Sequence, residues 1–115
     1  MELKKLVPEV AAIHDLSGYG RSALTVCIPV LSAMGVQVCP LPTAVLSSQT
    51  DGFDHYAMLD LADFMPKIAK HWEQLEISFD AVYSGFLGSS GQISFVDEFI
   101  HRFKKPGQRA SLLSP

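Results

Sequence analysis

Charged side chains are missing from a long central stretch of this sequence. Between Ser22 and Thr50 the chain has no Asp, Glu, Lys or Arg. A transmembrane helix needs roughly 20 apolar residues in a row. Here the stretch is interrupted by three prolines and a glycine, namely Pro29, Pro40, Pro42 and Gly35. A helix and a strand that are both buried in a covered parallel sheet therefore explain the stretch better than a membrane span.

The sequence also has few cysteines and a small net charge. Cys27 and Cys39 are the two cysteines, and no Cys/His group has metal-ligand spacing, so we expect no metal site. Without a recognisable signal peptide, free thiols and a cytoplasmic location are expected. A net charge of −3, with scattered Lys and Arg, argues against nucleic-acid and membrane partners. The length of 115 residues and the 48% hydrophobic content indicate one soluble domain with a buried core.

The first half of the chain alternates strand, turn and helix signals. An apolar run at residues 10–13 predicts a buried strand that ends near His14 and Asp15. Two glycines predict a turn over residues 17–20. Apolar residues then recur at helical spacing from about Ser22, and Gly35 is a suitable C-terminal stop. These signals predict a β-turn-α unit.

The rest of the chain continues the alternation. The patterns predict, in order, a strand at 36–41, a polar loop at 46–54, an amphipathic helix at 61–75 capped by Asp60, a strand at 79–86 and a helix at 93–103. The order β-α-β-α-β-α implies an α/β fold with three layers and a parallel sheet with right-handed crossovers.

Polar or small residues follow each predicted strand. Asp15 ends the first strand, Thr43 the second, and residues 84–88 the third. Open α/β sheets bind ligands at the carboxyl ends of their strands, so these residues predict a small-molecule site at one rim. Asp15 could equally bond nearby backbone amides, and we interpret His14 as a buried histidine with satisfied hydrogen bonds.

A glycine motif offers a competing interpretation. Gly18-x-Gly20-x-x-Ala23 follows a strand and precedes a helix, as the dinucleotide-binding fingerprint does. That fingerprint needs an acidic residue at the end of the second strand, and no carboxylate precedes Asp51 in this region. A simple strand-to-helix turn is the better explanation.

Four segments resemble a known family. Residues 13–25, which begin Ile-His-Asp-Leu-Ser-Gly-Tyr-Gly, and residues 28–35, 40–47 and 79–89 are similar to the pyridoxal/pyridoxamine kinases of the ribokinase-like superfamily. The resemblance extends over roughly residues 8–104. It implies a ribokinase-like fold, ATP and Mg²⁺ as cofactors, a B6 vitamer as the acceptor of the phosphoryl group, and a homodimer. The hydroxymethylpyrimidine kinases of thiamine synthesis share the Asp-x-Ser-Gly-x-Gly opening and are the nearest alternative.

The resemblance also implies which residues bind the substrate. In this chain they are Asp15, Tyr19, Thr43, Ser47, Gln49 and Phe86. Asp15 matches the position that bonds the ring substituents, and Thr43 matches a threonine that lines the pocket. The family's Ser-Asn-His-Thr segment is Ser-Ser-Gln-Thr at 47–50 here, which changes the aldehyde-side contacts. Phe86 replaces a frequent tyrosine, so stacking is retained but a phenolic hydrogen bond is lost.

The family's catalytic segments do not occur in these 115 residues. Neither Asp-Pro-Val-x-Gly-Asp nor Gly-x-Gly-Asp is present, so we expect no catalytic residue and no kinase activity in the chain as given. The resemblance ends near residue 104, and residues 105–115 look like a divergent tail from a frameshift or a truncated gene. A non-catalytic module that binds the vitamin, or that pairs with another chain, is the third alternative.

Overall fold

The computed structural model describes residues 7–20, 22–50, 52–85, 90–105 and 112–113. Eight elements follow one another: β1 (Glu9–Tyr19), α1 (Leu24–Ala33), β2 (Gln37–Ser48), β3 (Met58–Asp60), α2 (Met65–Gln74), β4 (Ala81–Ser84), α3 (Ser90–Phe103) and β5 (Leu112–Leu113). The sheet has the strand order β3-β2-β1-β4-β5. All neighbouring strands are parallel except β3, which is antiparallel to β2.

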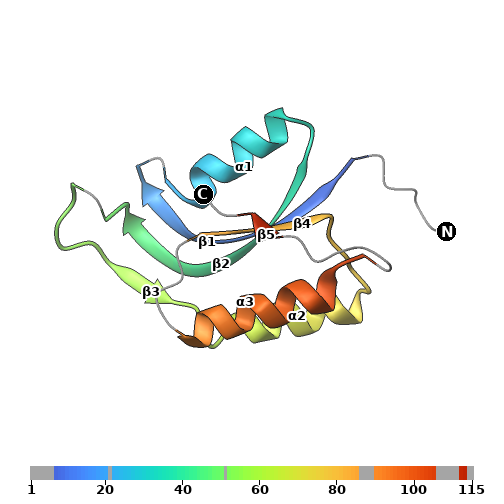
Figure 1. The fold of residues 1–115 in the computed structure, drawn as a ribbon. Coiled ribbons are helices and arrows are strands. Elements are labelled where there is room, and N and C mark those ends of the chain that lie inside the picture. Colours follow the sequence, from blue (N-terminus) through green and yellow to red (C-terminus); the bar gives the residue numbers. More distant parts are fainter. Residues whose placement is uncertain (1–6, 21, 51, 86–89, 106–111, 114–115) are drawn as a thin grey trace.

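Helices cover the sheet on both faces, which confirms the predicted three-layer α/β fold. In Figure 1, α1 lies on one face of the sheet, and α2 and α3 lie side by side on the other. We call these the α1 face and the α2–α3 face. None of the helices in the described residues is long and apolar enough to cross a membrane.

The α2–α3 face holds the larger core. Trp72 of α2, Phe79, and Phe99 and Phe103 of α3 form a cluster with ring centroids 4.4–6.2 Å apart. Ile13 of β1 is fully buried in the same core. Since each aromatic side chain buries a large apolar area, this cluster is the main hydrophobic contribution to folding.

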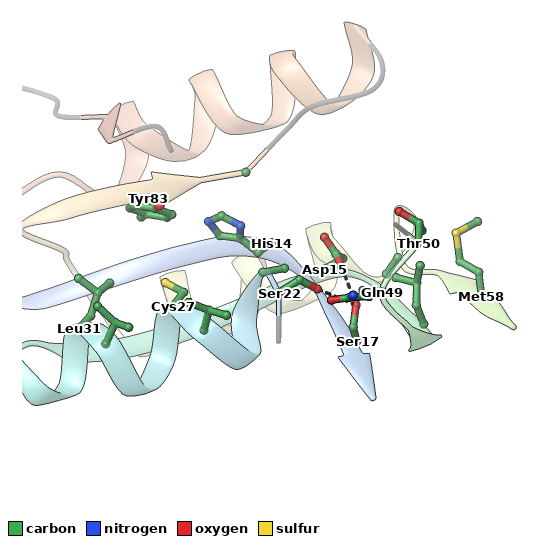
Figure 2. Close-up of a pocket in the computed structure, with 16 residues that line it drawn as sticks. His14, Asp15, Ser17, Ser22, Cys27, Leu31, Gln49, Thr50, Met58 and Tyr83 are labelled. Atoms are coloured by element: carbon green, nitrogen blue, oxygen red, sulfur yellow. Dashed lines mark hydrogen bonds between the residues drawn. The ribbon is translucent and has the colours of Figure 1, made fainter. Parts of the chain in front are cut away.

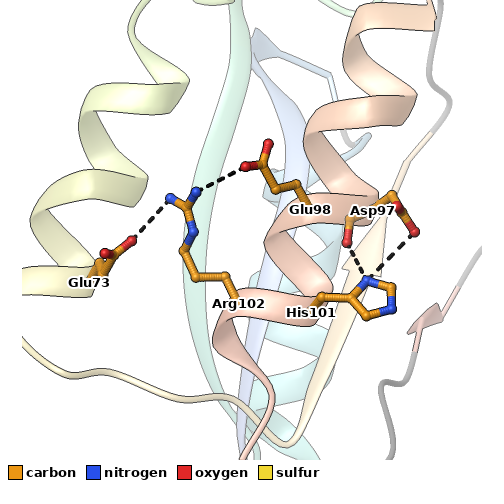
Figure 3. A network of polar contacts seen from close by, with 5 residues as sticks. All are labelled: Glu73, Asp97, Glu98, His101 and Arg102. Atoms are coloured by element: carbon orange, nitrogen blue, oxygen red, sulfur yellow. Dashed lines mark hydrogen bonds and ion pairs between the residues drawn. The ribbon is translucent and has the colours of Figure 1, made fainter.

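An exposed polar network joins α2 to α3 (Figure 3). The guanidinium of Arg102 donates to Glu98 on its own helix at 3.1 Å and pairs with Glu73 of α2 at 3.1 Å. On α3, Nδ1 of His101 lies 2.8 Å from the carbonyl oxygen of Asp97. These side chains are solvated, so the network contributes little to stability.

The end of α1 follows a standard pattern for helix termination. Gly35 has a φ of +85°, its N–H donates to the carbonyl of Ser32, and the next N–H donates to Leu31. Those two bonds form a Schellman motif, in which glycine is favoured because the left-handed conformation strains other residues. The predicted stop at Gly35 is confirmed, and Pro29 lies inside the helix.

The first two strands are longer than the sequence predicts. β1 continues through residues 17–19, where we expected a turn, and Ser17 and Tyr19 pair with Leu46 and Ser48 of β2. Gly18 lies where the two strands approach closely, since a Cβ there would lie 3.1 Å from the carbonyl oxygen of Ser47, which is tighter than an ordinary contact. The turn begins only at Gly20, whose φ is +101°.

The predicted loop at 46–54 is also partly wrong. Residues 46–48 belong to β2, and β3 pairs with residues 44–46 of β2 in the antiparallel direction. Asp60 does not cap α2, because it ends β3 and its carboxylate accepts the N–H of Ala62 at 2.7 Å. α2 begins later, at Met65.

The tail adds a short strand to the sheet. Leu112 and Leu113 pair in parallel with Val82 and Tyr83 of β4. Before it, Lys104 forms a bridge with Phe79 next to β4, and the ammonium of Lys105 pairs with the carboxylate of Asp80. Thus β5 occupies the edge position beside β4.

Candidate functional site

A pocket of about 900 Å³ opens on the α1 face, beside the carboxyl ends of β1 and β4 and the start of α1. Figure 2 shows side chains from β1, α1 and β4, and from the residues after β2, turned toward a common space. The carboxyl ends of parallel strands are the usual binding position in open α/β sheets.

One wall of the pocket is a chain of hydroxyl and carboxylate groups. The hydroxyl of Ser17 donates to Oδ2 of Asp15 at 3.2 Å, and the hydroxyl of Ser22 donates to Ser17 at 3.4 Å. Asp15 is half-buried, whereas Ser17 is only 1% exposed. An irregular register between β1 and β2 occurs at Asp15, where Thr43 and Ala44 of β2 lie opposite one residue of β1.

Gln49 lines the same part of the pocket. Its backbone N–H donates to the carbonyl of Tyr19 at 2.9 Å, which fixes the chain directly after β2. The side chain packs on Gly20, where a Cβ would lie 2.8 Å from the Gln49 amide. Glycine at position 20 therefore allows both the positive φ and the position of the Gln49 side chain.

His14 forms the wall near β4. Its ring stacks on Tyr83 with a centroid distance of 4.8 Å and an interplanar angle of 25°. A Cβ at Gly85 would lie 2.6 Å from Nδ1 of this ring, so a side chain larger than hydrogen cannot fit there without a shift. His14 is 7% exposed and thus buried, as expected, but among the described residues its Nε2 has no hydrogen-bond partner. The prediction that His14 is satisfied is not confirmed by the described residues.

The environment of His14 favours the neutral ring. Burial lowers the pKa of this imidazole below 6.5, and the nearby Asp15 carboxylate opposes that change with a smaller effect. A neutral imidazole offers one donor and one acceptor nitrogen. The protein thus keeps an uncharged polar ring in the pocket wall.

The remaining wall is apolar. α1 contributes two side chains from each of two successive turns, namely Val26, Cys27, Val30 and Leu31. Ala44, Leu46 and Met58 come from β2 and β3. Burial raises the pKa of the Cys27 thiol, which therefore stays protonated and behaves as a small apolar group. An apolar wall facing a few polar groups is typical of small-molecule sites.

The structure brings together some of the residues that the family resemblance implied. Asp15 and Gln49 line the pocket, whereas Tyr19, Thr43 and Ser47 are not among its lining residues. Tyr19 is 68% exposed and contacts Phe53 edge to face. The sixth residue, Phe86, lies outside the described residues.

Thr43 and Ser47 take part in strand pairing instead. The carbonyl of Thr43 accepts the N–H of Leu61, and the hydroxyl of Ser47 accepts the N–H of Ala57 at 2.8 Å. Both residues therefore fix the segments that flank β3.

In the part of the chain that the structure describes, no three His, Cys, Asp or Glu side chains could hold a metal ion.

Among the polar lining residues, Ser17, Ser22 and Tyr83 were not predicted, whereas Gly85 belongs to the predicted rim segment 84–88. Ser17 could have been found from strand periodicity, because side chains two positions apart share a face and Asp15 was already a candidate. The contribution of Tyr83 depends on its stacking with His14, for which the sequence carries no signal.

Comparisons with known proteins agree with this fold. No protein-family model and no curated protein matches the chain. A protein of Bacteroides thetaiotaomicron, provisionally assigned as a phosphomethylpyrimidine kinase, matches with 51% identity and a TM-score of 0.88 over 97% of this chain and 38% of that chain. A second crystal form of it, with pyridoxal, gives 53% identity and a TM-score of 0.84 over 94% and 37%.

A pyridoxal kinase is also similar. The enzyme of Lactobacillus plantarum matches with 28% identity and a TM-score of 0.82 over 93% of this chain and 37% of that chain. The chain thus spans less than two fifths of the length of these two relatives.

Proposed function

We propose that this chain, which matches the N-terminal part of the ribokinase-like pyridoxal and phosphomethylpyrimidine kinases, forms the acceptor-binding part of a B6 vitamer kinase. The reaction is the transfer of a phosphoryl group from ATP to the 5′-hydroxymethyl group of pyridoxal, pyridoxamine or pyridoxine. One observation carries the proposal: Asp15, in the C-terminal half of β1, lines the pocket, in a chain 53% identical to a protein crystallised with pyridoxal.

The chemistry of the pocket suits a substituted pyridine ring. Val26, Cys27 and Leu31 offer apolar surface to a ring face, and Asp15 accepts hydrogen bonds from ring substituents. The Gln49 amide can donate and accept. A hydrogen bond to a charged carboxylate is stronger than one between neutral groups, so Asp15 has the largest expected effect on affinity.

The described residues give no support for a nucleotide or Mg²⁺ site. They contain no cluster of metal-ligating side chains, and the 115 residues contain no Gly-x-Gly-Asp segment. We therefore assign this segment to acceptor binding and attribute no step of phosphoryl transfer to its residues. In an assay of pyridoxal phosphate formation, the chain alone should show no turnover, and turnover would contradict this assignment.

A hydroxymethylpyrimidine kinase is the second candidate. It is favoured by the assignment of the Bacteroides relative, which matches most of this chain. Both acceptors are flat nitrogen heterocycles with a hydroxymethyl group, and the same pocket suits either. Only relative affinity separates them.

Isothermal titration calorimetry tests the proposal. Pyridoxal, pyridoxamine and hydroxymethylpyrimidine are titrated into the chain, into the Asp15→Asn variant and into a control, Asp63→Asn, which changes an exposed aspartate outside the pocket. We expect a B6 vitamer to bind more tightly than the pyrimidine, and Asp15→Asn to weaken binding by about 10-fold to 100-fold. Tighter binding of the pyrimidine would favour the second candidate. Equal losses in both variants would contradict the role of Asp15.

A further inference from the structure

Ser17 is placed to orient the carboxylate of Asp15. The two residues lie two positions apart on β1, and the Ser17 hydroxyl donates to Oδ2 of Asp15 at 3.2 Å. Ser17 is 1% exposed, so its hydroxyl is shielded from water that could compete for the bond. Asp15 is half-buried at the pocket wall, where its carboxylate would otherwise be free to rotate.

The direction of the bonds is determined by a second hydroxyl. Ser22, just before α1, donates to Ser17 at 3.4 Å. A serine hydroxyl has a single proton and two lone pairs. Since Ser17 accepts from Ser22, its own proton is committed to Asp15. As far as the described residues go, the Oδ1 atom of Asp15 then remains for a donor from the pocket.

The start of α1 is itself firmly held. The N–H of Ser22 donates to Oγ1 of Thr25 at 3.0 Å, and that hydroxyl donates back to the Ser22 carbonyl at 2.7 Å. Ala23 has a φ of 50° and forms an isolated bridge with Leu16 of β1. A non-glycine residue at positive φ is strained, and such strain persists only where surrounding contacts fix it. Ser22 is therefore a fixed support for Ser17.

We propose that Ser17 is a positioning residue that holds one carboxylate oxygen of Asp15, so that the other oxygen faces the acceptor in the pocket. A side chain that is oriented before binding loses less conformational freedom when the ligand binds. The ligand-binding part of this inference rests on the proposed function, whereas the orientation of Asp15 does not.

The test combines calorimetry with NMR on the full 115-residue chain. The Ser17→Ala variant removes the hydroxyl, and Ser84→Ala is the matched control. Ser84 is a serine at the end of β4, 3% exposed, whose hydroxyl bonds the carbonyl of Gly85. For each protein, three-bond couplings give the χ1 angle of Asp15 without ligand, and titration gives the dissociation constant for pyridoxal.

Ser17→Ala should convert the single χ1 rotamer of Asp15 into an average of several and weaken pyridoxal binding by about 3-fold to 10-fold. In an Asp15→Ala background the same substitution should change affinity by less than about 2-fold, because the group that it positions is gone. Ser84→Ala should leave χ1 unchanged.

The two measurements separate this inference from the proposed function. If neither the original chain nor any variant binds a vitamer or the pyrimidine, the proposed function fails. The χ1 angle of Asp15 still decides in that case whether Ser17 orients Asp15. An unchanged χ1 angle in Ser17→Ala overturns the inference. An equal loss of affinity with and without Asp15 overturns it as well, since that is what a purely structural role predicts.

Discussion

The two faces of the sheet are built differently. On the α2–α3 face, five large aromatic side chains and Ile13 fill the space between helices and strands. On the α1 face, the buried core consists of Ala12, Leu24 and Cys27, and the space beyond it is the pocket. One face is packed with large apolar groups, and the other leaves volume next to polar strand ends.

This difference puts most of the stabilising burial on one face of the sheet and the pocket on the other. Burial of apolar area is the main favourable contribution to folding, and most of it comes from the α2–α3 face. The α1 face carries features that cost free energy, including the Nε2 of His14, which has no partner among the described residues, and the positive φ of Ala23. Substitutions on the two faces should therefore have different consequences.

The largest expected effect is on the α2–α3 face. Phe99 is 2% exposed and contacts Trp72, Phe79 and Phe103. Phe99→Ala should lower the free energy of unfolding by about 3–5 kcal/mol, measured by denaturant titration. Ile93→Ala, on the same helix but 55% exposed, is the control and should cost less than about 1 kcal/mol. Similar losses would contradict the assignment of the core to this face.

A smaller effect is expected where the α1 face is tightly packed. Gly85→Ala introduces a Cβ that would lie 2.6 Å from Nδ1 of His14, and the resulting strain should cost about 1–3 kcal/mol of unfolding free energy. In a His14→Ala background the cost should largely disappear, because the ring that the methyl group meets is gone. An equal cost in both backgrounds would show that the contact is not its cause.

The buried His14 makes stability depend on pH. Because its pKa in the folded state is below 6.5, the unfolded chain takes up a proton first as the pH falls. His14 therefore destabilises the folded state progressively below about pH 6.5, by at most about 1.4 kcal/mol per pH unit. The His14→Gln variant should lose this part of the slope in unfolding measured between pH 7 and pH 5. His55→Gln, at an exposed position, should keep it.

The smallest effect is expected at the ion pairs between α2 and α3. The side chains of Arg102 and Glu73 are 40% and 58% exposed. Arg102→Met should change the free energy of unfolding by less than about 1 kcal/mol, and 1 M salt should reduce the difference. A loss above 2 kcal/mol would mean that this network, and not the aromatic cluster alone, holds α3 on the sheet.

Much of the fold could be predicted because its elements have strong local signals. The stripe that includes Val96, Phe99 and Phe103 fits helical periodicity, and α3 follows it. β3 could not be predicted, because all three of its residues are exposed and it has no alternating pattern. Its pairing with β2 depends on contacts that no local window contains.

The continuation of β1 was missed for a related reason. Gly18 and Gly20 were both interpreted as turn residues, yet Gly18 lies within β1 close to the backbone of β2, and only Gly20 of the two has a positive φ. Asp15 could be predicted as a pocket residue because it follows the apolar run of the predicted strand. Ser17 was missed because the incorrect turn removed it from the strand face that it shares with Asp15, although strand periodicity could have indicated it.

The central claim is that the α1 face binds a B6 vitamer while the α2–α3 face only stabilises the fold. Titration of pyridoxal into the isotope-labelled chain, followed by backbone amide shifts, tests it directly. The account predicts saturable shifts at Ser17, Ser22 and Gln49, which line the pocket, and unchanged signals at Lys67 and Glu98 on α2 and α3. Absence of shifts at the pocket residues, or equal shifts on the α2–α3 face, would contradict it.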